Sequence, residues 1–324
     1  MKILVTGGAG YIGSTLVPIL LASGHYVRVL DNLSHGGKSL LGVWPDLNFE
    51  FYEGDVRNEQ NARAALRDME AVIHLAAIVG DPACARQPEL ARSINLDATI
   101  NLFNLAKEMG VKRFVFASTC SNYGKMKDGN GYVDETSELS PVSLYAETKV
   151  AVEKYLLDPS NSGDLSPTVL RFATAYGVSP RMRFDLTVNE FTMEILTKRK
   201  LVIFGEQFWR PYVHIRDISR AILCILEAPI EKVRNEVFNV GSTNQNFQKQ
   251  QLAEMMKSHV SDAAIEYVRK DEDPRDYRVS FEKIKQMIGF KTEHTVENGI
   301  AEVVKLVQSG IIRDFANAEY RNIP

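Results

Sequence analysis

A tyrosine and a lysine four residues apart are the residues most capable of chemistry in this chain. Residues 143–149 read SLYAETK, and residues four apart share a face of a helix, so Tyr145 and Lys149 are predicted to project together. A free tyrosine, with a pKa of about 10, is a poor base at neutral pH, but nearby positive charge favours its phenolate. Lowering that pKa by ~3 units corresponds to ~4 kcal/mol, which two close positive charges in a dry cleft can supply. The pair predicts a proton-abstracting tyrosine, although an amphipathic surface pair has the same spacing.

A glycine-rich turn near the start of the chain gives a second signal. Residues 6–13 read TGGAGYIG and lie between an apolar run at 2–6 and a helical pattern over 12–23. Gly7, Gly10 and Gly13 permit a tight turn, close approach of the backbone to a pyrophosphate, and close contact of helix and strand. The N–H groups and the positive dipole end of the next helix then face the phosphates. This context predicts a dinucleotide-binding turn.

Acidic residues at the ends of later strands refine the choice of dinucleotide. Asp31 follows the strand-like run VRVL, where a carboxylate accepts both adenosine ribose hydroxyls and repels a 2′-phosphate. NAD is therefore favoured over NADP, with a helix cap or turn aspartate as the alternative reading. Asp55 is a candidate adenine contact, with a solvated turn acid as its alternative. The positive nicotinamide ring of NAD is then the second charge that acts on Tyr145.

The elements that must position these residues alternate between strand and helix. Strands are expected at 2–6, 26–30, 49–52, 71–75, 113–118 and 167–172, and helices at 12–23, 59–68, 88–109 and 143–157. This alternation predicts an α/β fold, a Rossmann-type doubly wound parallel sheet. After residue 174 the segments become shorter and more polar, with helices expected at 186–197, 215–227, 248–258 and 296–308. We expect an NAD-binding domain at 1–174 and a smaller C-terminal α/β substrate lobe at 175–324, partly interleaved with the first.

Composition excludes several other classes of protein. The 324 residues carry a net charge of −3, so no basic excess exists to drive nucleic-acid binding. No apolar run approaches the ~20 residues of a membrane span, and the start MKILVTGG does not read as a secretory leader. The three cysteines (Cys84, Cys120 and Cys224) form no CxxC pair, which predicts reduced thiols in a cytoplasm. The histidines lack metal-ligand spacing, so no metal site is predicted.

Several motifs in order resemble those of the extended short-chain dehydrogenases/reductases, in the nucleotide-sugar epimerase/dehydratase branch. They are residues 6–13, 31–32 (DN), 54–55 (GD), 74–77 (HLAA), Asn95, 118–124 (STCSNYG), the Tyr145–Lys149 pair, 210–217 (RPYVHIRD) and 238–241 (FNVG). The resemblance implies that Tyr145 is the base, that Thr119 is its hydroxyl partner and that Lys149 also holds the nicotinamide ribose. The NAD contacts that it implies are Gly7, Gly10, Tyr11, Ile12, Gly13, Asp31, Asn32, Asp55, Val56, Leu75, Ala76, Ala77, Tyr145 and Lys149.

The reaction implied by this resemblance is epimerisation of a nucleotide-diphosphate sugar. The phenolate removes a proton from a sugar hydroxyl, usually at C4, while hydride passes to NAD; a transient 4-keto sugar then turns and takes the hydride back on its other face. The 4,6-dehydratases of the family carry an Asp-Glu pair where this chain has Cys120 and Ser121. The first alternative is a dehydratase that uses Cys120 as acid or base, although Cys120 also suits a space-filling role. An NAD-sensing binding module is the alternative of another class, and the intact catalytic set argues against it.

Substrate contacts are expected mainly from the second lobe. Arg210 matches a family arginine that binds the diphosphate, and either Arg275 or Arg278 lies where the family has its last phosphate-binding arginine. Thr174 stands where the family often has an asparagine, so the sugar contacts are expected to differ from those of common 4-epimerases. The family also implies a homodimer through the helices near 95–109 and 143–157.

Overall fold

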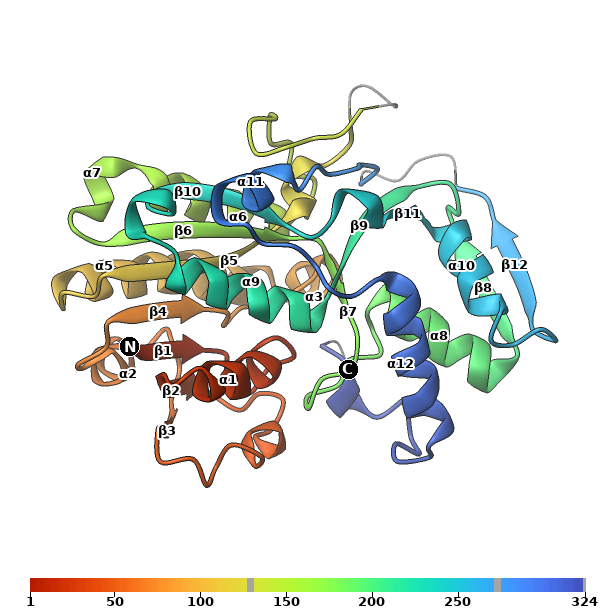
Figure 1. Cartoon of the computed structure of the whole chain (residues 1–324), viewed down its shortest axis with the longest axis horizontal. Coiled ribbons are helices and arrows are strands. Elements are labelled where there is room, and N and C mark those ends of the chain that lie inside the picture. The colour runs from red at the N-terminus through yellow and green to blue at the C-terminus, as the bar shows by residue number, and fades with distance from the viewer. Residues whose placement is uncertain (127–130, 271–274, 323–324) are drawn as a thin grey trace.

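A seven-stranded parallel sheet forms the larger lobe of the computed structural model, which describes residues 1–126, 131–270 and 275–322. The strand order is β10-β6-β5-β4-β1-β2-β3 (Figure 1). The order reverses at β1, between β4 and β2, and ligands of such sheets bind outside the carboxyl ends of the strands at this point. The predicted doubly wound sheet is therefore confirmed. Its strands are β1 (Lys2–Thr6), β2 (Tyr26–Asp31), β3 (Phe49–Glu53), β4 (Ala71–His74), β5 (Arg113–Thr119), β6 (Ser166–Phe172) and β10 (Glu236–Val240).

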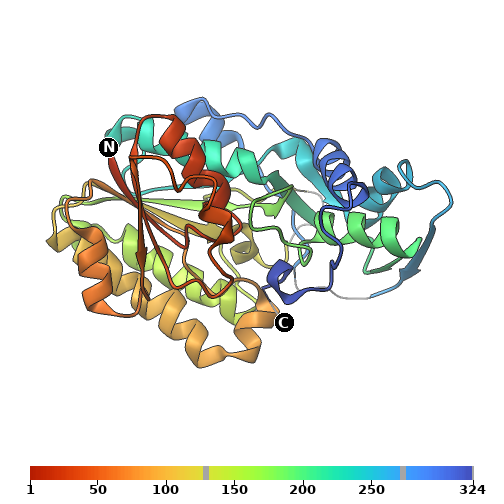
Figure 2. The ribbon, with the colours of Figure 1, turned by 90° about the horizontal axis from the view of Figure 1, so that it is seen from below.

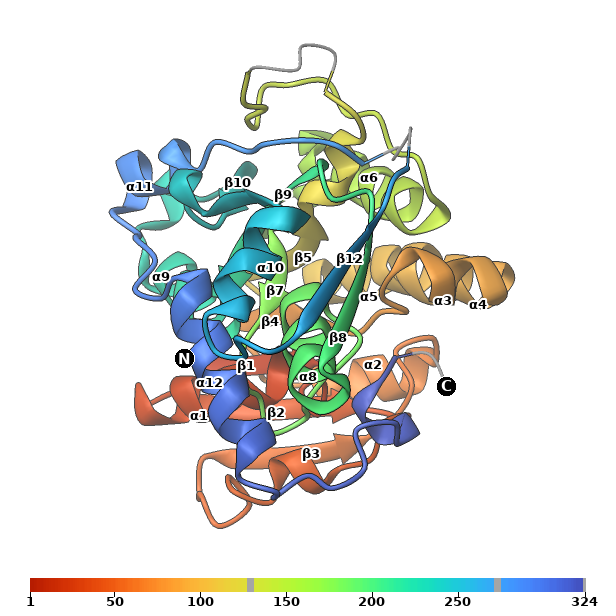
Figure 3. The ribbon, with the colours of Figure 1, turned by 90° about the vertical axis from the view of Figure 1, so that its right-hand side faces the viewer.

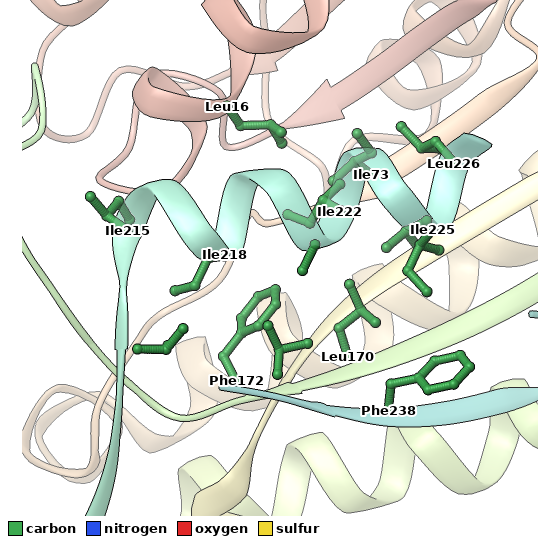
Figure 4. Close-up of a cluster of buried hydrophobic side chains, with 14 of the residues drawn as sticks. Leu16, Ile73, Leu170, Phe172, Ile215, Ile218, Ile222, Ile225, Leu226 and Phe238 are labelled. Carbon is green, nitrogen blue, oxygen red and sulfur yellow. The ribbon is translucent and has the colours of Figure 1, made fainter. Parts of the chain in front are cut away.

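Helices cover both faces of this sheet (Figure 2). One face packs against α1 (Gly13–Ala22), α9 (Ile215–Glu227) and α11 (Glu282–Ile288), and the other against α2 (Glu59–Leu66), α5 (Thr99–Glu108) and α6 (Leu144–Leu157). Figure 4 shows how Ile218 and Ile222 of α9 face Phe172 of β6 within the first of these two buried clusters. Among the helices of the described ranges, none combines the length and the apolar content needed to cross a membrane.

The long helix expected at 88–109 contains an irregular segment. It consists of α4 (Pro88–Arg92), a π-helical segment (Ser93–Ala98) and α5. Because a π-helical turn accommodates an extra residue, it can turn Asn95 inward. The buried Asn95 amide accepts from Ile78 N (2.8 Å) and donates to Ile78 O (2.9 Å). The segment that follows β4 is thereby fixed, and the short helices α3 (Asp81–Arg86) and α7 (Pro159–Ser162) complete this lobe.

The smaller lobe is built from short strands and three further α-helices. A β11-β9-β7 sheet and a β12-β8 pair lie against α8, α10 and α12, and Figure 3 shows β12 and β8 side by side. The predicted helices are confirmed here, whereas these strands were not anticipated individually. The boundary at residue 174 stays a prediction, since α9 and β10 return to the large sheet. The elements are β7 (Thr174–Tyr176), α8 (Thr187–Lys198), β8 (Lys200–Phe204), β9 (Trp209–His214), β11 (Asn246–Gln248), α10 (Lys249–Lys257), β12 (Ala264–Val268) and α12 (Val296–Gln308).

Candidate active site

The glycine turn after β1 has a backbone that larger residues cannot adopt. Gly7 has φ +73, and a Cβ there would lie 2.7 Å from Ala76 N. A Cβ on Gly13 would lie 2.5 Å from both Gly7 O and Gly8 Cα, whereas a Cβ on Gly10 would meet only Gly7 O, at 3.2 Å. Gly7 and Gly13 are thus required by the turn itself, while Gly10 leaves an open backbone surface. That surface, next to the N-terminus of α1, fits a pyrophosphate.

The carboxylate of Asp31 lies against this turn. Its Oδ2 accepts a hydrogen bond from Ala9 N (2.9 Å) and its Oδ1 accepts one from Leu33 N (2.8 Å). Burial raises the pKa of Asp31, although these two backbone donors oppose the rise. A carboxylate has about four lone-pair sites, so the group keeps capacity for the hydroxyls of a ribose. The residues present fit NAD in this respect.

The expected adenine contacts are arranged less simply. Asp55 forms a two-point ion pair with Arg57, with Nη2–Oδ2 at 2.6 Å and Nε–Oδ1 at 3.0 Å, and this pairing lowers the pKa of Asp55. Val56 is buried in the core, so only its backbone can face a ligand. Asn32 is exposed and accepts from Ser34 N (3.1 Å). Sequence reasoning missed Arg57, whose guanidinium takes up part of the hydrogen-bonding capacity of the Asp55 carboxylate.

The residues after β4 lie directly against the turn. Leu75 N donates to Thr6 O (3.1 Å), and Ala76 N donates to Thr6 Oγ1 (3.3 Å). Leu75, Ala76 and Ala77 are half-buried. The structure therefore brings these three predicted contacts together with the glycine turn at the end of the sheet.

The side chain of Tyr11 reaches from the glycine turn to the smaller lobe. Its hydroxyl donates to Gly177 O (2.7 Å) and accepts from Asn189 Nδ2 (3.3 Å). The ring is buried, so the side chain connects the turn to the smaller lobe. Position in a motif fixes the backbone, whereas the direction of this side chain depends on a partner far along the chain.

The tyrosine–lysine pair lies in the first half of α6. Ser143 caps the helix by accepting from Ala146 N (3.3 Å). The Lys149 ammonium donates to Ala117 O of β5 (2.7 Å) and lies 5.9 Å from the centroid of the Tyr145 ring. Lys149 is buried and Tyr145 is half-buried. The two side chains share a face, as their spacing predicts.

The protein alone does not lower the pKa of this tyrosine. Burial raises the pKa of the Tyr145 hydroxyl, nearby Cys84 and Asp81 raise it further, and Arg183 opposes them. Burial lowers the pKa of Lys149 to about 8. The charge of the lysine favours the phenolate, but the desolvation of both groups disfavours each charged form.

Thr119 and Cys120 lie at the end of β5 but point to different surroundings. Thr119 Oγ1 accepts from Ser121 N (3.1 Å) and caps the 3-10 turn Cys120–Tyr123. The Cys120 side chain is 1% exposed, and its thiol donates to Arg171 O (3.3 Å). Burial raises the pKa of this thiol well above its ordinary value. The Cys120 side chain thus lies in the core, and its part in the chemistry stays a prediction.

A cavity of about 330 Å³ lies between the two lobes. Among the described residues that line it, three are cationic (Arg210, Arg275 and Lys249) and none is acidic. The Arg278 guanidinium lies elsewhere, 5.0 Å from the ring centroids of Tyr132 and Trp209. The other lining residues are Ser121, Thr174, Thr187, Phe191, Val202, Phe204 and Tyr277. The structure thus gathers Arg210, Arg275 and Thr174 at one cavity; Lys249 and the two phenylalanines were missed because no local motif marks them.

A buried ion pair braces α6 against the sheet. Arg171 Nη2 lies 2.6 Å from Glu153 Oε2, with side chains only 5% and 2% exposed. Asn122 Nδ2 also donates to Glu153 Oε1 (2.8 Å), and Arg171 Nη1 donates to the Tyr123 hydroxyl (3.0 Å). Because Glu153 lies one turn after Lys149, this network holds the catalytic part of α6 next to β5. Sequence reasoning missed it, since its members are distant in the chain.

The turn, the acid after β2 and the tyrosine–lysine pair define a class of dinucleotide-dependent α/β enzymes with a cleft between two lobes. Residues 3–241 match the NAD dependent epimerase/dehydratase family, and the chain belongs to this family.

Individual relatives extend the similarity over nearly the whole chain. A UDP-glucose 4-epimerase of Corynebacterium glutamicum is 29% identical over 320 residues, which cover 93% of this chain and 94% of that protein. The structure of a UDP-glucose 4-epimerase from Thermotoga maritima, solved with UDP-glucose, has a TM-score of 0.85 and 30% identity and covers 96% of this chain and 100% of its own. A dTDP-glucose 4,6-dehydratase from Streptomyces venezuelae, solved with NAD, has a TM-score of 0.84 and 26% identity, with 95% and 97% covered.

Proposed function

We propose that this chain is an NAD-dependent nucleotide-sugar epimerase that acts through a transient 4-keto sugar. The observation that carries the proposal is the Tyr145–Lys149 pair on a helix that is connected to a cavity whose described lining has three cations. Asp81 connects the two, since it binds both Ser143, which caps the helix of Tyr145, and the cavity residue Arg275. Relatives with the names of UDP-glucose and UDP-glucuronate 4-epimerases support the same reaction.

The cofactor site follows from the residues at the end of the sheet. The glycine turn would hold the pyrophosphate of NAD, Asp31 the adenosine ribose, and Lys149 the nicotinamide ribose. When bound, NAD supplies reversible acceptance of a hydride. The family to which the chain belongs is NAD-dependent, which supports this assignment.

The side chains of this protein then transfer the proton and stabilise the charges of the phenolate and the diphosphate. Tyr145 removes the proton of the sugar hydroxyl, with Thr119 as its hydroxyl partner, and the Lys149 ammonium stabilises the phenolate. Arg210 and Arg275 suit a diphosphate because a planar guanidinium can donate two parallel hydrogen bonds to one phosphate group. Lys149 is held by Ala117 O, so its position does not depend on the substrate.

Two observations favour epimerisation over dehydration. The chain has Cys120 and Ser121 where the dehydratases of the family carry an acid and a base. Cys120 faces Arg171 O in the core, and it is absent from the lining of the cavity. Cys120 is therefore not placed to act as a base at C5, whereas epimerisation at C4 needs no such base.

We further propose that the enzyme is a cytoplasmic homodimer. The three cysteines are free thiols, which suits a reducing compartment. The layer formed by α5 and α6 is the expected dimer surface, because the family pairs the corresponding helices into a four-helix contact. Light scattering on the purified protein gives the mass in solution, and a monomer at micromolar concentration would contradict the dimer.

The direct test is product analysis with a panel of UDP-, TDP-, GDP- and CDP-sugars, NAD and no reductant. A product of unchanged mass and inverted stereochemistry by NMR is the expected result, with Tyr145→Phe as the inactive control. Loss of one water mass would assign a dehydratase instead and make Cys120 the first residue to substitute. Absence of conversion across the panel would overturn the catalytic proposal.

A further inference from the structure

One carboxylate connects the cationic wall of the cavity to the helix that carries Tyr145. Asp81 Oδ1 accepts from Ser143 Oγ (2.6 Å), and Asp81 Oδ2 lies 2.8 Å from Arg275 Nη1. Ser143 and Arg275 belong to segments 132 residues apart, so this contact is a tertiary link rather than a local turn. The Asp81 side chain is 24% exposed and that of Arg275 is 39% exposed. The link therefore lies at the cleft between the lobes.

The backbone holds Asp81 in place on the side of the large sheet. The Asn95 amide fixes Ile78 through two hydrogen bonds. Gly80 then adopts φ +95, a conformation that L side chains rarely adopt, and Asp81 begins α3 directly after it. The backbone on both sides of Gly80 therefore fixes the position of Asp81 at the start of α3, close to the start of α6.

The contact with Ser143 acts on the first turn of α6. The Ser143 hydroxyl donates to Asp81 while it accepts from Ala146 N (3.3 Å), so the same hydroxyl serves the helix cap and the link. Tyr145 lies in this first turn. A shift of the cap would move the tyrosine relative to the end of β5, and misplacement by about 1 Å can cost ~100-fold in rate.

The contact with Arg275 acts on the wall of the cavity. A guanidinium is a rigid planar fork, so a carboxylate that holds one edge fixes the plane in which the rest of the fork is presented. Arg275 lines the cavity and has a flexible side chain whose ordering costs free energy on binding. Asp81 therefore places this arginine before a ligand arrives.

We propose that Asp81 is a positioning residue whose two carboxylate oxygens couple the arginine that receives the substrate's diphosphate to the first turn of the helix that carries Tyr145. The inference rests on the proposed function, in which Arg275 binds diphosphate and Tyr145 is the base. Its consequence is that nucleotide affinity and proton transfer both depend on one carboxylate, which holds Arg275 and Ser143. The electrostatic influence of Asp81 on Tyr145, whose pKa it helps to raise, agrees with this proximity.

The test separates the two contacts with four variants. Affinity for UDP is measured by calorimetry, which needs no turnover, and kcat is measured with the substrate identified by the panel. Arg275→Ala is expected to weaken UDP binding about tenfold, as for loss of a charged hydrogen bond, and Ser143→Ala to lower kcat about tenfold with UDP affinity unchanged. Asp81→Ala should show both losses. Asp81→Asn, whose amide oxygen can still accept from Ser143, should recover kcat but not UDP affinity.

A double-substitution cycle and a matched control complete the design. Asp81→Ala should add no further loss of UDP affinity in the Arg275→Ala background. Asp262→Ala removes a carboxylate from another arginine pair (Arg199, 3.3 Å) that is exposed, and it should change neither quantity; thermal unfolding checks that each variant folds.

Three results would overturn the proposal. They are additive losses of UDP affinity in the double variant, unchanged UDP affinity in Asp81→Ala, and a wild-type protein that does not bind UDP. Failure of the proposed function has a different signature. It would show as absence of turnover in a wild-type protein whose UDP affinity still depends on Asp81 and Arg275 as a pair.

Discussion

The glycine turn and the wall of the cavity are built in opposite ways. The turn uses eight consecutive residues, 6–13, and works through backbone positions that tolerate no larger side chain at Gly7 or Gly13. The side chains of the wall come from the 3-10 turn after β5, from β7, β8 and β9, from α8 and α10, and from the segment at 275–277. A site made of backbone can be recognised from a short run of consecutive residues. A site made of side chains from distant segments forms only when the chain has folded. Helix α6, which carries Tyr145 and Lys149, is connected to the wall through Asp81.

The largest effect is expected at helix α6. Tyr145→Phe removes only the hydroxyl that exchanges the substrate proton, so kcat should fall about 10³-fold. UDP affinity and thermal stability should stay unchanged, because no hydrogen bond of this hydroxyl braces the described residues. NMR of the product mixture measures the rate, and activity within tenfold of the wild type would remove Tyr145 from the mechanism.

Lys149, on the same helix α6 as Tyr145, should lower the free energy of unfolding because its buried ammonium is desolvated. Burial lowers its pKa from 10.5 to about 8, so below pH 8 the folded protein holds a buried ammonium that costs about 3 kcal/mol relative to the unfolded chain. Between pH 8 and 10.5 the folded state has lost this proton and the unfolded state still binds it, so this contribution makes stability rise with pH.

Lys149→Met should therefore raise the free energy of unfolding of the NAD-free protein at pH 7, by less than that amount because Ala117 O loses its donor. The gain should shrink as the pH increases from 8 to 10.5. Urea unfolding at pH 7 and pH 10 measures both values, and a destabilised variant at pH 7 would contradict the assignment.

On the turn, Gly13→Ala should weaken NAD binding by about 10- to 100-fold. The new Cβ would lie 2.5 Å from Gly7 O and Gly8 Cα, and such overpacking costs about 1–3 kcal/mol because backbone cannot move aside. UDP affinity should change little, since the wall is untouched. Gly42→Ala is the matched control, because no atom lies within 4 Å of its added Cβ. Equal losses for both ligands would show that the turn and the wall are not separate sites.

On the wall, Arg210→Ala should give the reverse pattern, with UDP affinity about tenfold lower and NAD affinity unchanged. Arg278→Ala serves as its control, since that guanidinium lies against Tyr132 and Trp209 instead of lining the cavity. Calorimetry with each ligand separates the outcomes. A greater loss of UDP affinity for Arg278 than for Arg210 would mean that the wall has been assigned incorrectly.

The smallest effect is expected at Cys120. Its thiol faces Arg171 O in the core, so Cys120→Ala should keep kcat within threefold and lower the free energy of unfolding by about 1 kcal/mol for the small cavity. Product analysis and denaturant unfolding measure the two quantities. A 100-fold loss of turnover with intact folding would restore this thiol to the chemistry.

The contrast between the two regions also explains what could be read from the sequence. The sheet, its order of helices and the turn were predictable because hydrophobic periodicity and glycine positions act over short stretches. Arg210, Arg275 and Thr174 were found only through family motifs. Lys249, Phe191 and the Glu153–Arg171 pair could not be found, since their roles depend on partners brought together by the fold. Tyr11 shows the limit within a motif, because the partner of its side chain, Gly177, lies 166 residues further along the chain.

The return of the chain to the large sheet constrains how such an enzyme can diversify. After the first strands of the smaller lobe, α9 covers one face of the sheet and β10 pairs with β6 over five residues, from Glu236 with Thr168 to Val240 with Phe172. Removing the segment after residue 174 would expose both the edge of β6 and the apolar face that α9 covers, which invites aggregation. Recombination therefore cannot replace the smaller lobe as an independent unit. New substrate preferences are expected to arise by point changes along the cavity wall, while the scaffold is inherited as a single unit.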